Sequence, residues 1–150
     1  MQTLSELMVR VSVQLKVLFV CSGNSYRSPV AEALLSKYAP KGVEVSSAGI
    51  SPISWISEHG RQFLEKENAS KYLKVRPEGL EIRQPRDYDL IVAMEMKHKF
   101  SILQRCPECA DRIEVWNIDD PYDTSPEYEE AVYRNIKTKV KELAERLNKK

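Results

Sequence analysis

The chain has 150 residues, of which 42% are hydrophobic, and it carries 23 Lys and Arg against 22 Asp and Glu. This length suits a single domain with one core, and the composition is typical of a globular protein rather than a disordered one. The nearly neutral charge indicates neither a nucleic acid nor a membrane as the main partner. No apolar run approaches the roughly 18 residues of a membrane span, and the N-terminus does not resemble a signal peptide, so we expect a cytoplasmic protein.

The first 15 residues are predicted to be an extension that precedes the domain. Apolar and polar residues alternate over its last part, VRVSVQL, as in a half-exposed strand. Two alternatives stay open, namely a strand that extends the sheet or mediates weak self-association, and a flexible tail. Residues 16–150 are predicted to form one domain, because no repeat, low-complexity segment or linker rich in Gly and Ser divides them.

Four short apolar runs are typical of strands, and they alternate with helical patterns along the chain. The predicted strands are residues 17–20, 43–46, 90–94 and 112–116. The predicted helices are residues 28–38, 57–67 and 95–104, followed by a long amphipathic helix from about residue 128. Such alternation implies right-handed crossovers. We therefore expect an α/β fold of three layers (α-β-α), with a four-stranded parallel sheet and helices on both faces.

The junction between the first strand and the first helix reads CSGNSYRSP. Small residues (Ser22, Gly23, Asn24 and Ser25) allow the loop to curl so that its N–H groups converge. Ser28 is expected to cap the helix with Pro29 at its first position, which directs the helix N-terminus at the same point. The junction therefore predicts a phosphate-binding loop directly after the first core strand.

Two side chains give this loop a possible chemistry. Arg27 supplies a planar fork that suits two oxygens of one phosphate. Cys21 lies at the base of the loop, where the same positive field would stabilise a thiolate directed at phosphorus. A single cysteine at the end of a buried strand is more often a small core residue, but the ordered combination with the loop and arginine favours the nucleophile.

The segment NIDDPYD follows the fourth predicted strand, so it reaches the same edge of the sheet. A thiolate that attacks a phosphate ester requires an acid to protonate the leaving oxygen, and Asp120 is the candidate. Tyr122 beside it is a candidate wall for a substrate ring. An ordinary Asp-Pro turn is the alternative interpretation when the segment is considered alone.

These motifs resemble the low-molecular-weight protein tyrosine phosphatase family. The family loop, C-x5-R-[ST] after the first strand, matches CSGNSYRS. The segments SSAGI, DYDLIVAME and DDPYD resemble the regions after the second strand, at the third strand and at the acid loop. The resemblance extends from about residue 16 to the C-terminus, and it implies that residues 16–150 form a single phosphatase domain.

The resemblance implies a role for each matching residue. Cys21 would be the nucleophile that becomes a phosphocysteine, Asp120 the general acid and then the general base, and Arg27 a ligand of the phosphate and its transition state. The backbone of the loop would also bind phosphate, with Asn24, Ser28 and Ser47 as its support. The loop residues concerned are Ser22, Gly23, Asn24, Ser25, Tyr26, Arg27 and Ser28. The implied reaction takes a phosphotyrosine protein or small aryl phosphate, releases inorganic phosphate, and needs no cofactor or metal.

Two other functions are carried as alternatives. The fold is shared with thiol-dependent arsenate reductases, but Met94 and Glu95 stand where the first relay cysteine would follow the third strand. The second alternative is a non-catalytic module that binds phosphate or phosphotyrosine. Retention of both Cys21 and Asp120 favours an enzyme over such a module.

Several features lie outside the main motif. Tyr26 occupies a position where many family members have a cysteine, and Trp55 is a candidate second wall of the substrate pocket or else a partly buried surface aromatic. For Cys106 and Cys109, a disulfide or two inert thiols are favoured over zinc, since they offer only two ligands. His98 is expected on a solvated helix face.

Overall fold

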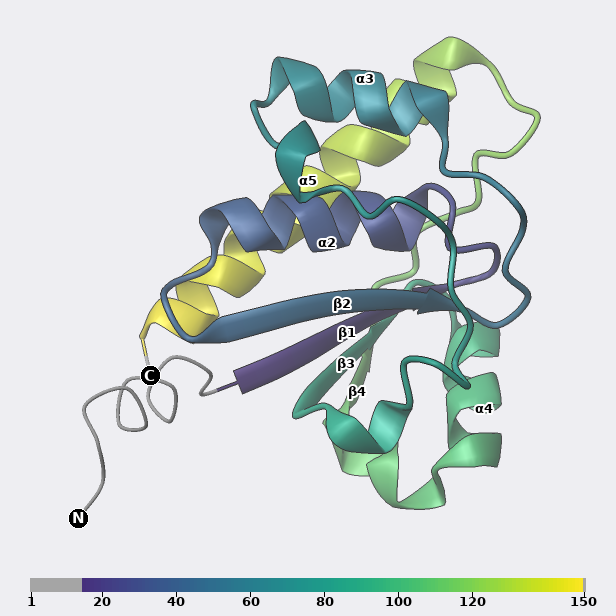
Figure 1. The fold of residues 1–150 in the computed structure, drawn as a ribbon, viewed down its shortest axis with the longest axis vertical. Helices are drawn as coiled ribbons and strands as arrows, with labels where there is room; N and C mark the ends of the chain where they lie inside the picture. The colour runs from purple at the N-terminus through teal and green to yellow at the C-terminus, as the bar shows by residue number, and fades with distance from the viewer. Residues whose placement is uncertain (1–14, 150) are drawn as a thin grey trace.

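A four-stranded parallel sheet with the strand order β2-β1-β3-β4 forms the centre of the fold (Figure 1). The structure is a computed structural model, and it describes residues 15–149. Our predictions for residues 1–14 therefore lie outside the described part of the chain. The strands are β1 (Leu15–Cys21), β2 (Val43–Gly49), β3 (Leu90–Ala93) and β4 (Ile113–Val115).

Helices cover both faces of this sheet, which confirms the predicted three-layer α/β architecture. One face carries α2 (Arg27–Tyr38), α3 (Glu58–Lys66) and α5 (Pro126–Asn148), and α4 (Met96–Arg105) covers the other (Figure 1). Three short 3-10 helices, which the sequence patterns did not predict, complete the fold: η1 (Ser70–Tyr72), η2 (Pro85–Asp87) and η3 (Pro107–Arg112).

Strand β1 is central because its residues are apolar on both faces. Val17, Phe19 and Cys21 pack into the core beneath α2 and α5, whereas Leu18 and Val20 pack into the core on the α4 side. None of these five side chains is more than 3% exposed. Because all four strands are parallel, their carboxyl ends meet at one edge of the sheet, and the loop after Cys21 begins there.

The start of α2 differs from our prediction. The helix begins at Arg27, and Tyr26 occupies the N-cap position without a side-chain cap hydrogen bond. The Ser28 hydroxyl is instead directed at the Cys21 thiol and the Asn24 amide, each 2.9 Å away. The prediction that Ser28 caps the helix is therefore wrong, because this hydroxyl supports the loop.

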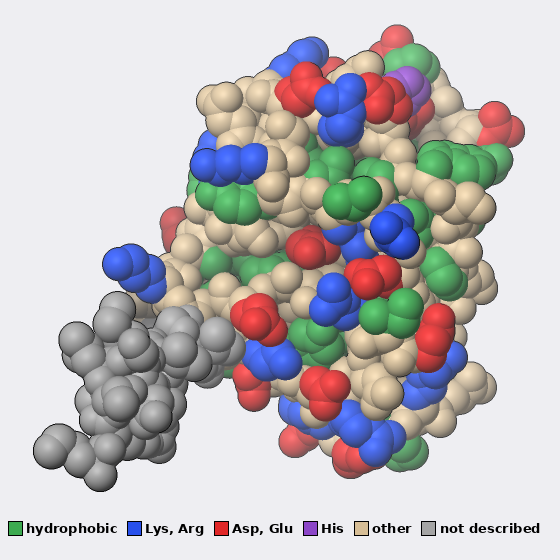
Figure 2. All heavy atoms as spheres, viewed as in Figure 1, with side chains coloured by type: hydrophobic (Ala, Val, Ile, Leu, Met, Phe, Trp, Pro, Cys, Tyr) green, Lys and Arg blue, Asp and Glu red, His purple; other side chains and the backbone are tan. Residues whose placement is uncertain are grey.

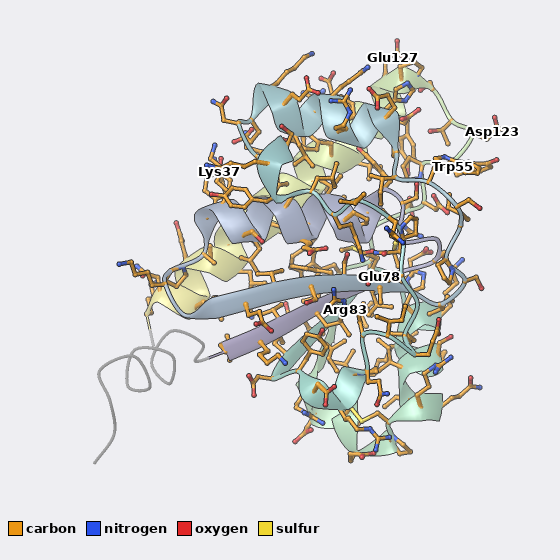
Figure 3. The ribbon with its side chains drawn as sticks, in the orientation of Figure 1. Lys37, Trp55, Glu78, Arg83, Asp123 and Glu127 are labelled. Carbon is orange, nitrogen blue, oxygen red and sulfur yellow. A yellow bond between two sulfur atoms is a disulfide. The ribbon has the colours of Figure 1, made fainter. Side chains whose placement is uncertain are left out.

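Cys106 and Cys109 are joined by a disulfide at the carboxyl-terminal end of α4. Both are fully buried, and they pack with Leu18 and Val20 in the core on the α4 side of the sheet. Figure 3 shows this bond in the lower part of the molecule. Cys21 belongs to the core on the opposite face. The disulfide is thus separated from Cys21 by the sheet.

The surface of the described residues is charged but mixed. On the face drawn in Figure 2, acidic and basic side chains lie interspersed. Within residues 15–149, no helix is both long and apolar enough to span a bilayer. In the same part of the chain, no group of three or more His, Cys, Asp or Glu side chains is arranged to hold a metal ion.

Candidate active site

The loop between β1 and α2 turns its carbonyl groups away from the site. The oxygens of Cys21, Ser22, Gly23 and Ser25 accept backbone N–H groups from residues 50–57, at 2.9–3.1 Å. Gly49 permits this close approach, since a Cβ there would lie 2.5 Å from the Ser22 oxygen. With the carbonyls bonded outward, the loop N–H groups are left free to converge on an anion at the N-terminus of α2.

Asn24 stabilises the turn of the loop through its backbone conformation and its side-chain hydrogen bonds. Its φ of 52° lies in the left-handed region, which asparagine tolerates better than most residues. The side chain is fully buried, and its Nδ2 donates to the hydroxyls of Ser28 and Ser47, each at 2.9 Å. Ser47 in turn donates to the Glu32 carboxylate at 2.5 Å. The structure thus brings the three predicted supporting residues together beneath Cys21.

The Arg27 side chain is only 2% exposed, and residues that follow two different strands bind its guanidinium. Its Nη1 donates to Glu95 Oε1 at 2.5 Å and to the Ile118 carbonyl at 2.7 Å. Its Nη2 lies 3.6 Å from Asp120 Oδ2 and 3.4 Å from Ser22 Oγ. Glu95 follows β3 and Ile118 follows β4, so the carboxyl ends of both strands orient the guanidinium at the loop.

Asp120 approaches the loop from the segment that follows β4. Its Oδ1 accepts the N–H of Tyr122 at 3.0 Å, which fixes the turn, while Oδ2 is directed at Arg27. The side chain is 47% exposed and lines the cavity. The neighbouring Asp119 instead accepts the Tyr128 hydroxyl at 2.8 Å and does not line the cavity. Of these two adjacent acids, Asp120 is the one that lines the cavity and faces Arg27.

A cavity of about 510 Å³ opens above the loop, a size in the usual range for small-molecule sites. Cys21 and Arg27 lie at its base. Trp55 and Tyr122, which are 61% and 78% exposed, contribute to its lining from two different loops. Figure 3 shows Trp55 and Asp123 at the same edge of the molecule. The rest of the lining is mixed, with apolar Ile53 and Pro121 beside the acidic Glu58, Asp123 and Glu129.

His98 corrects our prediction of a solvated histidine, because its side chain is fully buried. Its Nδ1 accepts the backbone N–H of Glu95 at 2.9 Å, so the proton resides on Nε2 and is donated to Ser22 Oγ at 2.9 Å. Burial, and after it the nearby Arg27 guanidinium, lowers the pKa of His98 from 6.5 to about 4. The neutral ring therefore ties the N-terminus of α4 to the loop.

Tyr26 packs into a cleft between two helices. Its hydroxyl donates to the Glu129 carbonyl at 2.8 Å, and its ring lies 6.5 Å from that of Phe63. Burial, followed by the Glu129 carboxylate and Tyr133, raises the pKa of this phenol well above its usual value. The neutral Tyr26 side chain thereby anchors the loop to α3 and α5. As Cys106 and Cys109 are paired, Cys21 is the one free thiol among the three cysteines of the chain.

Fold and site together define an α/β protein with a cysteine and an arginine at the base of an anion-binding loop. Comparison with known proteins agrees with this class. Residues 16–150 match the family described as low molecular weight phosphotyrosine protein phosphatase. The low molecular weight protein-tyrosine-phosphatase Etp of Escherichia coli K12 is 34% identical over 145 residues, which cover 89% of this chain and 95% of Etp.

A protein-arginine-phosphatase of Geobacillus stearothermophilus is 32% identical over 146 residues, covering 88% of this chain and 95% of that protein. The solved structure of YwlE arginine phosphatase from Geobacillus stearothermophilus superposes with a TM-score of 0.81 at 30% identity, over 91% of this chain and 94% of that one. The chain therefore belongs to the low molecular weight phosphotyrosine protein phosphatase family, and it is an enzyme.

Sequence reasoning missed Glu95 and His98 as parts of the site, and also Lys74, whose Nζ donates to Asn24 Oδ1 at 2.7 Å. A signal for Glu95 was present, since it directly follows the third predicted strand and so reaches the edge where the loop lies. Glu95 is the N-cap of α4 and His98 stands three residues later in its first turn, a spacing that places both side chains near that edge. Lys74 lies in a segment without periodicity, and we find no sequence signal that identifies it.

Proposed function

We propose that this enzyme hydrolyses phosphotyrosine, or a related aryl phosphate, through a phosphocysteine on Cys21. The observation that carries the proposal is the convergence of the Cys21 thiol, the Arg27 guanidinium and the Asp120 carboxyl group on one cavity. Arg27 and the loop N–H groups would hold the phosphate oxygens and stabilise the charge that develops on them in the transition state.

In the first step, the Cys21 thiolate attacks phosphorus, and an S–P bond forms as the bond between phosphorus and the phenolic oxygen breaks. Asp120 gives its proton to that oxygen, and the phenol leaves. The Ser28 hydroxyl, 2.9 Å from Cys21 Sγ, stabilises the thiolate before attack and after its release.

In the second step, the Asp120 carboxylate removes a proton from water, and the water oxygen attacks phosphorus. The S–P bond breaks, inorganic phosphate is released, and the thiolate is restored. Tyr122 and Trp55 would flank the ring of the substrate, because both are exposed aromatic residues that line the cavity.

Hydrolysis of para-nitrophenyl phosphate tests the chemistry. We expect Cys21→Ser to abolish turnover and Asp120→Asn to slow it by about 10² to 10⁴, the usual range for general acid catalysis. Asp111→Asn, an exposed change in η3, serves as the matched control and should leave the rate unchanged. An unchanged rate in Asp120→Asn would transfer the acid role to Asp123, the other aspartate that lines the cavity.

Phosphoarginine is a second candidate substrate, and the acidic lining of the cavity favours it. Glu58, Asp123 and Glu129 line the cavity, and carboxylates there would attract a guanidinium group. Glu58 is also paired with Arg61, and Glu129 lies 2.7 Å from His59 Nδ1, which leaves Asp123 as the acid without such a partner among the described residues. The Geobacillus relative named as a protein-arginine-phosphatase supports testing this substrate. Rates on a phosphotyrosine peptide and on a phosphoarginine peptide of the same sequence would separate the two candidates.

The arsenate reductase alternative is not favoured. Its relay would require two further thiols that reach the loop cysteine. Cys106 and Cys109 are instead bonded to one another in the core on the other face of the sheet. A non-catalytic binding module is also not favoured, because the chain belongs to a family of enzymes and retains Cys21, Arg27 and Asp120 around one cavity.

A further inference from the structure

Lys74 contacts the loop at Asn24, and neither of these two residues lines the cavity. Its side chain is only 9% exposed, although a buried ammonium is unfavourable unless it is paired and hydrogen-bonded. The Nζ atom donates to Asn24 Oδ1 at 2.7 Å and to the Ser47 carbonyl at 2.9 Å, and it forms an ion pair with Glu78 at 2.8 Å. All three N–H groups of the ammonium therefore have an acceptor.

The hydrogen bonds that start at Lys74 run in one direction and end at Cys21. Asn24 Oδ1 accepts both Lys74 Nζ and the backbone N–H of Glu78, which leaves Asn24 Nδ2 to donate to the Ser28 hydroxyl. That hydroxyl is 2.9 Å from Cys21 Sγ, and it donates when the sulfur is a thiolate. Each donor in this series polarises the next, so a positive charge at one end favours a negative charge at the other.

The charged groups that face Lys74 do not cancel its charge completely. Glu78 is shared, because its carboxylate also accepts Arg83 Nε at 3.2 Å, and Figure 3 shows Glu78 and Arg83 as neighbours. Glu32 is the other acid near this cluster, and burial raises its pKa despite the hydrogen bond from Ser47. Lys74 and Arg83 therefore share the Glu78 carboxylate, and burial disfavours the ionised form of Glu32.

We propose that Lys74 is a positioning residue whose positive charge stabilises the Cys21 thiolate through Asn24 and Ser28. The inference rests on the proposed role of Cys21 as the nucleophile. It deepens that role, because it identifies a cation that does not line the cavity, in addition to Arg27 and the helix N-terminus. Lys74 does not touch the substrate, so it acts only through the other two side chains.

The test is the pH dependence of Cys21 alkylation by iodoacetamide, which follows the thiolate and needs no turnover. We expect Lys74→Met to move the midpoint of this profile about one unit to higher pH, which is a tenfold loss of reactivity at a pH below both midpoints. Lys71→Met is the matched control. Lys71 lies in the same segment but its ammonium is placed over the Tyr72 ring, so its removal should not move the midpoint.

Two more variants separate charge from hydrogen bonding, and they also serve if Lys74→Met fails to fold. Lys74→Gln offers a donor to Asn24 without a charge, and we expect a shift similar to that of Lys74→Met. Lys74→Arg retains the charge, and we expect a midpoint within a few tenths of a unit of the wild type. A wild-type midpoint in Lys74→Gln, or a large shift in Lys74→Arg, would overturn the electrostatic role.

The outcome can be distinguished from failure of the proposed function itself. If the wild type hydrolyses para-nitrophenyl phosphate but no Lys74 variant moves the alkylation midpoint, Lys74 is structural and the inference is wrong. If the midpoint moves as expected but the wild type has no turnover, the link between Lys74 and Cys21 holds and the catalytic proposal fails.

Discussion

The buried neutral His98 should make the folded enzyme less stable as the pH falls below 6.5, and the substitution His98→Asn should remove this effect. In the folded protein its pKa is about 4, compared with 6.5 for an ordinary histidine. Below pH 6.5 the unfolded chain therefore binds a proton that the folded chain does not. The contribution of His98 to stability is complete above pH 6.5 and is lost progressively as the pH falls to about 4.

The magnitude follows from these two pKa values. The full difference corresponds to about 3 kcal/mol of unfolding free energy, and about 2 kcal/mol of it should already be lost at pH 5. We expect His98→Asn to be less stable than the wild type at pH 7.5, because it loses the bond to Ser22, but also less sensitive to acid.

Urea unfolding at pH 7.5 and pH 5.0 measures both effects, with the fluorescence of buried Trp116 as one signal. The wild type should lose about 2 kcal/mol more than His98→Asn between the two pH values. His59→Asn is the comparison variant, because it removes the other, exposed histidine and leaves His98 in place, so its stability should still decline more steeply with acid than that of His98→Asn. An equally steep decline in His98→Asn and the wild type would refute a buried neutral His98.

Two further predictions concern packing around the loop and the disulfide. At Gly60 an added Cβ would lie 2.9 Å from the Tyr26 ring, so Gly60→Ala should destabilise the protein by about 1–3 kcal/mol in urea unfolding. The same change should cost less in a Tyr26→Cys background, because the added Cβ would no longer meet the ring and would still meet Val30 Cγ2, at 3.1 Å. The Cys106–Cys109 bond closes a loop of only four residues, so its reduction should lower the free energy of unfolding by about 2 kcal/mol. Reduction should leave para-nitrophenyl phosphate hydrolysis unchanged. Loss of activity on reduction would contradict the separation of this bond from Cys21.

The sequence predicted the sheet and the loop because both depend on local patterns. Buried strands such as β1 are continuous apolar runs, and the loop residues stand in order over eight positions from Cys21 to Ser28. The parallel topology then brings Asp120 to the same edge without any knowledge of side-chain contacts. Local patterns and topology therefore predict where the backbone places a residue, but they do not predict which side chains pack against that residue.

The failures come from side chains whose environment is set by tertiary contacts. Ser28 has the ideal residue type and position for a helix cap, yet its hydroxyl is directed at Cys21 and Asn24. His98 stands between two lysines in MKHKF, which resembles an exposed face, yet its ring turns inward to reach Ser22. In both cases a contact with the loop determines the orientation, and no local propensity encodes it.

Tyr26 shows how one substitution in the loop is matched elsewhere in the chain. A tyrosine at this position requires space on α3, and Gly60 provides it, because any larger residue there would meet the ring. It also requires an acceptor for a buried hydroxyl, and the Glu129 carbonyl in α5 provides that. Tyr26 therefore stands where a cysteine would place a thiol next to Arg27, and its side chain joins the loop to α3 and α5 instead. It follows that Tyr26 accounts both for the anchoring of the loop to α3 and α5 and for the absence of a thiol at the position before Arg27.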